Sequence, residues 1–315
     1  MPRASGKDLC EIFGYAPDDR SEAARKQWKS QRCPFVDAVC CKHSHPREGG
    51  ETIIYGACSV VGKGNGSNDA EEVIICPRRL YQDGLASLKH CVQDALGKQQ
   101  TTLLADEYTA MKRVNALPDE FSVLLGQLSG KEINVRKAGG AKLSYDWVIA
   151  CQQGDKVTQI VPCEVQSIDI TGNYRAAWDA YATESASIPN SGHGMNWANV
   201  WKRLIPQLLF KAAVTTTSTL CKKGLYFIVP ELVFRKFEEV LGEVPLVDAA
   251  DNGVISVFTY ELGTKVPFGQ MRGLAPVRTA RMRLTDLQAA FTSGDQLPSG
   301  SVLDTKVLEV LQALA

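Results

Sequence analysis

The chain has 315 residues and is electrically balanced, with 35 basic and 35 acidic side chains, so its bulk charge does not indicate a nucleic-acid partner. Its hydrophobic share of 44% and charged share of 22% are ordinary for a globular protein and exclude a disordered or fibrous chain. The segment from Met1 to Gln31 lacks the order of a signal peptide, and no apolar run is long enough to span a bilayer. We therefore expect a cytoplasmic protein with one large domain or two modest ones and no membrane partner.

The front of the chain combines short predicted elements with a concentration of cysteines. We predict helices at Lys7–Gly14 and Ser21–Ser30, and a hairpin of two strands at Ile53–Val61 and Glu72–Cys76 around a glycine-rich loop. Five of the ten cysteines lie in this part, at Cys33, Cys40, Cys41, Cys58 and Cys76. Four thiolates around one ion suit Zn²⁺ or iron. The spacing has no Cys-x-x-Cys pair, however, and by itself favours ordinary buried cysteines.

The middle of the chain is predicted to contain helices and then the first strands of a sheet. Helical periodicity covers three pieces, Leu85–Leu96, Asp106–Leu117 and Phe121–Leu128. Lys131–Val135 is predicted as the first core strand. Trp147–Cys151 and Val157–Ile170 are rich in β-branched and apolar residues, which favours strands. The turn residues Gln152–Asp155 between them predict a hairpin.

Folding this hairpin about Asp155 gathers polar side chains at its open end. Asp146 and Glu164 lie nine residues on either side of Asp155 and are predicted to face each other. Gln166 lies two residues beyond Glu164 and points to the same face of the strand. Two carboxylates and an amide oxygen are ligands that Mg²⁺ accepts beside a phosphate substrate. The cluster indicates a magnesium site, although two surface acids on an amphipathic hairpin would show the same pattern.

The last part of the chain is predicted to alternate helices with strands. Helices are expected at Tyr174–Ala182, Asn196–Val214 with a kink at Pro206, Glu231–Leu241 and Val302–Leu314, and strands at Leu225–Val229 and Val254–Leu262. The stretch from Asn196 to Leu225 contains basic residues and no acid, namely Lys202, Arg203, Lys211, Lys222 and Lys223. It predicts a phosphate-binding patch or a solvated helix face. The amphipathic helix Val302–Leu314 suits core packing or dimer formation.

Several separated motifs in one order carry a resemblance to a known family. They are RCPF at Arg32–Phe35, GACS at Gly56–Ser59, ICPRRL at Ile75–Leu80, SYDW at Ser144–Trp147, EVQSIDITGNY at Glu164–Tyr174, NWANV at Asn196–Val200, KRLIPQ at Lys202–Gln207 and KGLYFI at Lys223–Ile228. In these motifs, over most of its length, the chain resembles the NotI and EagI family of type II restriction endonucleases, with EagI the nearer. The order of Asp, hairpin and Glu-x-Gln resembles the PD-(D/E)XK superfamily, with Gln166 where the lysine would stand.

The resemblance implies a fold and two groups of site residues. The fold would be α/β, with a restriction-endonuclease-like core of a mixed sheet flanked by helices in residues 86–315. A small four-cysteine metal-binding subdomain would occupy residues 1–85. In the core, Asp146 and Glu164 would bind Mg²⁺ and act with Gln166. Glu132 matches an acidic position near the family's active site and would be a further acid, or else an exposed strand glutamate.

The implied metal site of the front subdomain uses four cysteines in a structural role. The implied ligands are Cys33, Cys40, Cys58 and Cys76, holding iron, with zinc as the alternative. Cys40 is preferred over Cys41 because the family pattern is Cys-x-Lys, and Cys40 stands two residues before Lys42. His43 and His45 are the alternative ligands.

The resemblance also implies partners and leaves rival functions. It implies a homodimer in the bacterial cytoplasm that cuts double-stranded DNA at a GC-only palindrome related to CGGCCG, with a cognate methyltransferase as genetic partner. His193, Asn196 and Asn199 are placed where they could reach base edges. The rivals are a repair nuclease of the same fold without tight specificity, a non-catalytic metal-containing DNA-binding regulator, and a thiol hydrolase that uses Cys163.

Overall fold

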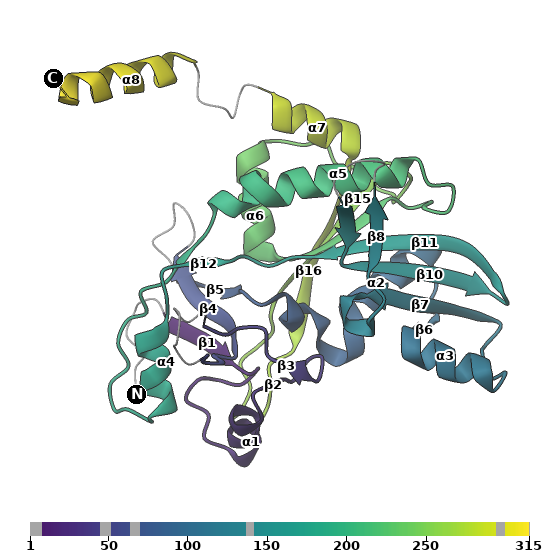
Figure 1. Ribbon diagram of the computed structural model, residues 1–315, viewed down its shortest axis with the longest axis horizontal. Coiled ribbons are helices and arrows are strands. Elements are labelled where there is room, and N and C mark those ends of the chain that lie inside the picture. The colour runs from purple at the N-terminus through teal and green to yellow at the C-terminus, as the bar shows by residue number, and fades with distance from the viewer. Residues whose placement is uncertain (1–7, 45–51, 64–69, 137–141, 294–299, 315) are drawn as a thin grey trace.

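The computed structural model describes residues 8–44, 52–63, 70–136, 142–293 and 300–314. Within them a seven-stranded mixed sheet forms the centre of the molecule, in the order β16-β15-β14-β11-β10-β7-β6 (Figure 1). β14 pairs in parallel with β11 and β15, and β6 pairs in parallel with β7, whereas the other neighbours are antiparallel. The prediction of an α/β protein with a mixed central sheet flanked by helices is confirmed.

The central sheet is apolar on both faces because helices cover both. Its strands are β6 (Thr101–Leu104), β7 (Glu120–Gly126), β10 (Trp147–Gln153), β11 (Lys156–Val165), β14 (Leu225–Pro230), β15 (Val254–Leu262) and β16 (Leu274–Arg283). All six residues of β14 are buried. Phe227 packs in the cluster shared with α5, α6 and α7, and its neighbour Tyr226 packs in the cluster shared with α2. Such two-sided burial is what a continuous apolar strand predicts.

The helices divide between the two faces of the sheet and the front of the chain. They are α1 (Glu22–Ser30), α2 (Gln82–Leu96), α3 (Ala105–Arg113), α4 (Arg175–Ala182), α5 (Ile205–Thr216), α6 (Glu231–Leu241), α7 (Leu284–Thr292) and α8 (Gly300–Leu314). Short turns of helix are η1 (Pro77–Tyr81), η2 (Gln127–Ser129) and η3 (Val200–Leu204). The kink predicted at Pro206 corresponds to η3, a π-helical turn that runs directly into α5. Ser21 caps α1 by accepting from the N–H of Ala24.

The front of the chain builds its own small sheets, one of which contacts the central sheet through β5 and β15. They are β1 (Asp8–Ile12), β4 (Ala57–Lys63) and β5 (Ala70–Ile74) in one sheet, and β2 (Arg32–Cys33) with β3 (Ala38–Val39) in another. Two further pairs are β8 (Ile133–Arg136) with β9 (Lys142–Tyr145), and β12 (Ile170–Thr171) with β13 (Gly194–Met195). Leu9 and Val60 belong to the same apolar cluster as Phe227, so the core is continuous across the predicted boundary at residue 85.

Two predictions of element type are wrong. Lys7–Gly14 was expected to be helical, but Asp8–Ile12 is the strand β1, paired with β4. Phe121–Leu128 was also expected to be helical, but β7 supplies the strand beside the hairpin. A short run with few polar residues satisfies both periodicities, and pairing with β4 for β1, and with β6 and β10 for β7, decides in favour of the strand. The strand predicted at Lys131–Val135 exists as β8, outside the central sheet.

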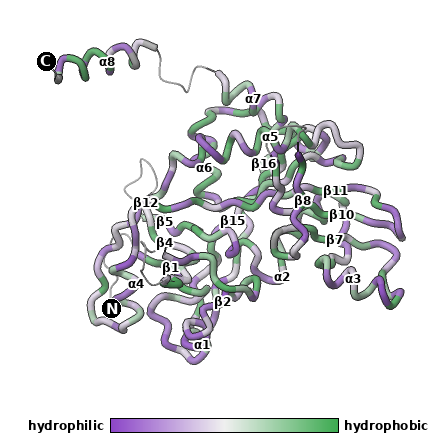
Figure 2. Tube along the Cα trace, in the orientation of Figure 1, coloured by the Kyte–Doolittle hydropathy of each residue, from purple (hydrophilic) through white to green (hydrophobic). Residues whose placement is uncertain are grey.

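Helix α8 stands apart from the body of the molecule in Figure 1. It retains an amphipathic character, visible in Figure 2 as alternation of hydrophobic and hydrophilic residues. Its exposed apolar side chains are Val302, Val307, Leu308, Val310 and Leu311. Of the helices that the structure describes, none has the length and apolar content needed to cross a membrane.

Candidate functional site

The hairpin that carries the candidate acids has the predicted register. β10 and β11 are antiparallel, and Trp147 pairs with Cys163. Asp146 and Glu164 are the next residues outward, so they face each other at the open end of the hairpin, as predicted. Glu164 also lies beside Phe227 of the parallel strand β14. The acids therefore lie in the middle of the seven-stranded sheet, at one end of its strands.

Asp146 lies at a bend where the chain passes from β9 into β10. One oxygen of its carboxylate, Oδ2, accepts the N–H of Val165 at 2.9 Å and the Nε2 of Gln166 at 3.4 Å. Its own N–H donates to Oε1 of Glu164 at 3.3 Å. A Cβ on Gly126 would lie 2.4 Å from the carbonyl oxygen of Asp146, so glycine is what lets the strands approach here. The two carboxylates and the amide thus form one connected cluster.

Glu164 is a buried acid with a buried cationic partner. It is 3% exposed, and its Oε2 forms an ion pair with Lys211 of α5, which is 7% exposed. Burial, and then the negative charge of Asp146, raise the pKa of Glu164 to about 8, against the lowering effect of Lys211. A further cation beside these oxygens would stabilise the charged form of Glu164. The all-oxygen donor set fits Mg²⁺.

Gln166 and Glu132 join this cluster to different degrees. The backbone N–H of Gln166 donates to the carbonyl of Ile228 at 3.0 Å, which fixes the residue at the end of β11 while its side chain contacts Asp146. Glu132 immediately precedes β8, and its neighbour Ile133 pairs with Tyr145. The backbone of Glu132 is therefore close to Asp146, but its side chain is exposed. Its part in the chemistry stays a prediction.

Lys211 is the site residue that sequence reasoning missed, because it was assigned to a basic surface patch. The buried residues of α5 are Ile205, Leu208, Lys211, Ala212 and Thr215. They follow the spacing of one helix face, so Lys211 falls at a position where an apolar residue is expected. A lysine on the apolar face of a helix that packs on a strand carrying a buried glutamate is the signal that could have found it.

A small cavity opens beside Gln166. Its volume is about 80 Å³, and its polar lining includes Gln166, Asp169, Asn199, Arg203 and Gln207. Asn199 donates to Asp169 at 3.3 Å, and the side chain of Arg203 is exposed. The cavity thus combines the amide of the predicted site with an arginine of the basic stretch. Such a combination suits a phosphate group next to the cluster.

The cysteines of the front segment lie near one another and are largely buried. Burial raises the pKa of Cys40 to about 11 and that of Cys58 well above its ordinary value, and neighbouring cysteines add to both shifts. The Sγ atoms of Cys41 and Cys76 lie 3.8 Å apart, and this contact lowers the pKa of Cys41 to about 6. Cys33 is buried on β2, where it pairs with Ala38 of β3. A set of close thiols fits a soft metal by its donor chemistry.

The alternative ligands and the metal geometry are less favourable. His43 has its Nδ1 3.0 Å from the carbonyl oxygen of Ser44, whereas His45 lies outside the described residues. Over the described part of the chain, no three or more histidine, cysteine, aspartate or glutamate side chains are arranged as a metal site. The assignment of Cys33, Cys40, Cys58 and Cys76 as ligands therefore stays a prediction.

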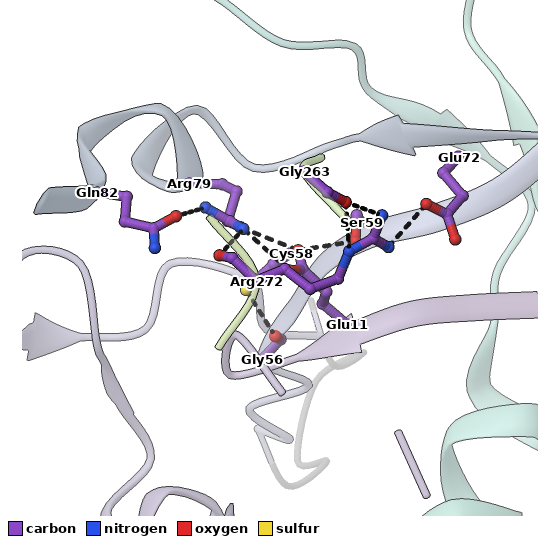
Figure 3. Close-up of polar contacts among 9 residues, drawn as sticks. All are labelled: Glu11, Gly56, Cys58, Ser59, Glu72, Arg79, Gln82, Gly263 and Arg272. Carbon is purple, nitrogen blue, oxygen red and sulfur yellow. Dashed lines mark hydrogen bonds and ion pairs between the residues drawn. The ribbon is translucent and has the colours of Figure 1, made fainter. Parts of the chain in front are cut away.

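A buried ion pair fixes the cysteine segment to the rest of the molecule (Figure 3). Arg79 is 0% exposed and donates to both carboxylate oxygens of Glu11 at 3.0 Å. The same guanidinium donates to Gln82 and to the carbonyl of Arg272, at 2.8 Å for the latter. The hydroxyl of Ser59, which is next to Cys58 in the chain, donates a further hydrogen bond to Glu11 at 2.9 Å. The network ties β1, β4 and η1 to the chain between β15 and β16.

Two candidates for other roles are removed by burial. His193 was expected near DNA base edges, but it is 0% exposed, with Nε2 3.0 Å from the carbonyl of Val61 and Nδ1 2.5 Å from Oγ of Ser191. This position is structural, because both ring nitrogens face protein atoms. Cys163 is also 0% exposed, and burial raises the pKa of its thiol well above the ordinary value. A thiol in that state is not a nucleophile, which excludes the thiol hydrolase.

Comparison with known proteins identifies no relative of this chain among family models or curated proteins. The site is therefore defined by its own residues: two facing acids, an amide and a buried lysine at one end of a mixed sheet.

Proposed function

We propose that the protein is a Mg²⁺-dependent type II restriction endonuclease of the PD-(D/E)XK kind. It cleaves double-stranded DNA at a short GC-rich palindrome related to CGGCCG and leaves 5′ overhangs. The observation that carries the proposal is the convergence of Asp146, Glu164 and Gln166 in one hydrogen-bonded cluster. Clustered carboxylates would repel a polyanion, so a DNA-binding protein has reason to retain them only if a cation joins them.

The surrounding fold supports this assignment. A hairpin of β10 and β11 presents the acids, β7 flanks it, α5 follows the hairpin, and β14 then pairs in parallel with β11. This is the order of strand, hairpin, helix and strand expected for a restriction-endonuclease-like core. Asp146 lies at the bend before β10, where its side chain is free of the β-ladder and directed to the open end.

The residues of the site divide the chemistry of phosphodiester hydrolysis. Asp146 and Glu164 would hold Mg²⁺, and the chemistry this ion supplies is charge neutralisation at the phosphate and a lowered pKa of the attacking water. Gln166 carries no titrating proton near neutral pH, so it cannot be the general base. Its amide orients the water or contacts the scissile phosphate. The general base would be a metal-bound hydroxide, another acid such as Glu132, or the substrate itself, and Arg203 would bind a neighbouring phosphate.

The front segment is proposed as a four-cysteine metal subdomain with a structural role. Cys33, Cys40, Cys58 and Cys76 would hold one iron or zinc ion, and the Glu11–Arg79 network would fix this segment to the core. Elemental analysis of folded protein is expected to find one such ion per chain. Cys58→Ser should lower stability more than it changes cleavage specificity, because metal binding and folding are coupled. Folded protein with neither metal would contradict this part.

A homodimer is proposed because a palindrome is read by a two-fold assembly with one active site per strand. The exposed apolar side chains of α8, among them Leu308 and Leu311, support a second copy as the partner of this helix. Sedimentation should show a dimer with cognate DNA. A monomer both free and on DNA, or cleavage confined to one strand, would contradict it.

The test of the function is digestion of a sequenced plasmid by purified protein with Mg²⁺, followed by mapping of the ends. We expect discrete fragments whose ends share one GC-rich palindrome. Fragments with unrelated ends would favour the repair nuclease of the same fold. Specific DNA binding without cleavage under any divalent cation would favour the non-catalytic regulator, and a cognate methyltransferase would then have no role.

A further inference from the structure

We propose that Lys211, brought from helix α5 to the buried carboxylate of Glu164, is the cationic positioning residue of the catalytic cluster. Its ammonium group would take the place of the lysine that position 166 lacks. The inference rests on the proposed nuclease function and adds a residue to it.

Geometry places the ammonium group where the strand itself provides none. Glu164 faces the side of the sheet covered by α5, while its neighbours Cys163 and Val165 face the cluster shared with α2. Nζ of Lys211 forms the ion pair with Oε2 of Glu164, and both side chains are buried. At the next position on this face, Gln166 offers an amide in place of an ammonium group. The positive charge therefore enters from the helix.

The position of Lys211 is fixed by a second contact. The hydroxyl of Tyr145 donates to the backbone carbonyl of Lys211 at 3.0 Å, and Nζ lies 5.8 Å from the centroid of the Tyr145 ring. Tyr145 is the last residue of β9 and directly precedes Asp146. One side chain thus fixes α5 to the bend that carries the first acid. A displacement of α5 would move the lysine and disturb Asp146 together.

A lysine at this position has no adequate explanation in packing alone. An isolated buried ion pair is weak evidence of stabilisation, because desolvation offsets the attraction of the two charges. An apolar residue at position 211 would suit the face formed by Leu208 and Ala212. Once a bound cation favours the ionised form of both carboxylates, the cluster of two acids and one lysine carries a net single negative charge, which suits one divalent cation. Lys211 also holds the plane of the Glu164 carboxylate by engaging Oε2.

The experiment compares single-turnover cleavage by the wild type, Lys211→Met and Lys211→Met with Gln166→Lys. Lys211→Met should slow cleavage by about 100-fold, the size of effect seen when one preorganised charge is lost. Because the amide of Gln166 already contacts Oδ2 of Asp146, a lysine there returns an ammonium group to the same carboxylates. It should recover about tenfold in rate. Lys98→Met is the matched control, since Lys98 pairs with Glu120 at the opposite, turn end of the sheet.

Two measurements independent of turnover separate a positioning role from a merely structural one. DNA affinity in EDTA should be the same for the wild type and Lys211→Met, because a buried lysine does not contact the backbone phosphates. Unfolding of Lys211→Met, Glu164→Gln and the double variant should show coupling between the two residues. Folded Lys211→Met that cuts at the wild-type rate would overturn the inference. So would a loss that Gln166→Lys does not relieve.

The remaining outcomes are also decisive. If Lys211→Met does not fold, the exchange variant Lys211→Gln with Gln166→Lys keeps one lysine beside Glu164, and it should fold and cut. Failure of that variant to fold would assign Lys211 to structure alone and overturn the inference. Failure of the wild type to cut any DNA would instead reject the proposed function, so the two failures are distinguishable.

Discussion

Two buried ion pairs of this protein, Arg79 with Glu11 and Lys211 with Glu164, are alike in burial and differ in what surrounds them. Arg79 and Glu11 both have further hydrogen-bond partners. The guanidinium also donates to Gln82 and to a backbone carbonyl, and Glu11 also accepts from Ser59. The pair of Lys211 and Glu164 differs, because a second acid, Asp146, faces the same carboxylate and helps to raise the pKa of Glu164. A pair with every partner satisfied holds segments together. A pair with excess negative charge is prepared for a cation.

The largest expected effect tests the excess charge. Asp146→Ala should abolish cleavage, a loss of more than about a thousandfold, because it removes a metal ligand. Cognate DNA should still bind, and more tightly, because removal of a carboxylate beside phosphate relieves repulsion. Single-turnover cleavage and filter binding measure the two quantities. Cleavage by Asp146→Ala would mean that the active site lies elsewhere.

Loss of the Arg79–Glu11 pair should lower the free energy of unfolding. Arg79→Met leaves Glu11 buried without its guanidinium and should destabilise the fold by about 3–5 kcal/mol. Urea unfolding measures the loss, and the exposed arginine of the pair Arg175–Asp179 serves as control through Arg175→Met, with an expected change below about 1 kcal/mol. Equal losses from the two variants would show that burial of the pair contributes nothing.

The amide of the cluster should have a smaller effect on rate than the acids. Gln166→Ala should slow cleavage by about 100-fold while the cleaved sequence stays the same, because the side chain orients the reacting groups and holds no metal by itself. Rates and mapped ends on one plasmid measure both. An unchanged rate would remove Gln166 from the site, and altered ends would make it a specificity residue.

The gentlest test is the pH dependence of stability without metal. The folded pKa of Glu164 is about 8, above its ordinary value of 4.5, so the folded state keeps a proton that the unfolded state releases. The stability from this group is fully present below about pH 4.5 and is lost as the pH rises towards 8. In Glu164→Gln, the free energy of unfolding should not show this part of the pH dependence. Parallel pH profiles for the two proteins would contradict the raised pKa.

The comparison also shows what sequence could predict. The hairpin register followed from Asp155 and the alternation of β10 and β11, because a turn and a period of two fix which residues face each other. Phe121–Leu128 was misassigned because a short apolar run carries no unambiguous period. Lys211 was missed because its partner Glu164 lies 47 residues away in the sequence. No local sequence pattern predicts that the strand of Glu164 packs against α5.

A second example is the group of Arg272, Arg278, Arg281 and Arg283, since arginines that lie close together in a sequence suggest contacts with guanine. In the structure Arg278 pairs with Glu231 and Glu238, and Arg281 pairs with Asp94. Composition revealed the cluster of positive charge, but acids distant in the sequence neutralise it. Ion pairs between elements that are distant in the sequence are therefore visible only in the folded structure.

The most direct test of the central contrast compares Glu164→Gln with Glu11→Gln in one assay of cleavage and unfolding. Glu164→Gln should lose cleavage with Mg²⁺ and should lose less stability than Glu11→Gln, because it leaves Lys211 buried beside an amide but also removes the repulsion between Glu164 and Asp146. Glu11→Gln should lose stability and still cut below its unfolding temperature. The reverse pattern, with Glu164→Gln active and unstable, would contradict the assignment of the catalytic cluster.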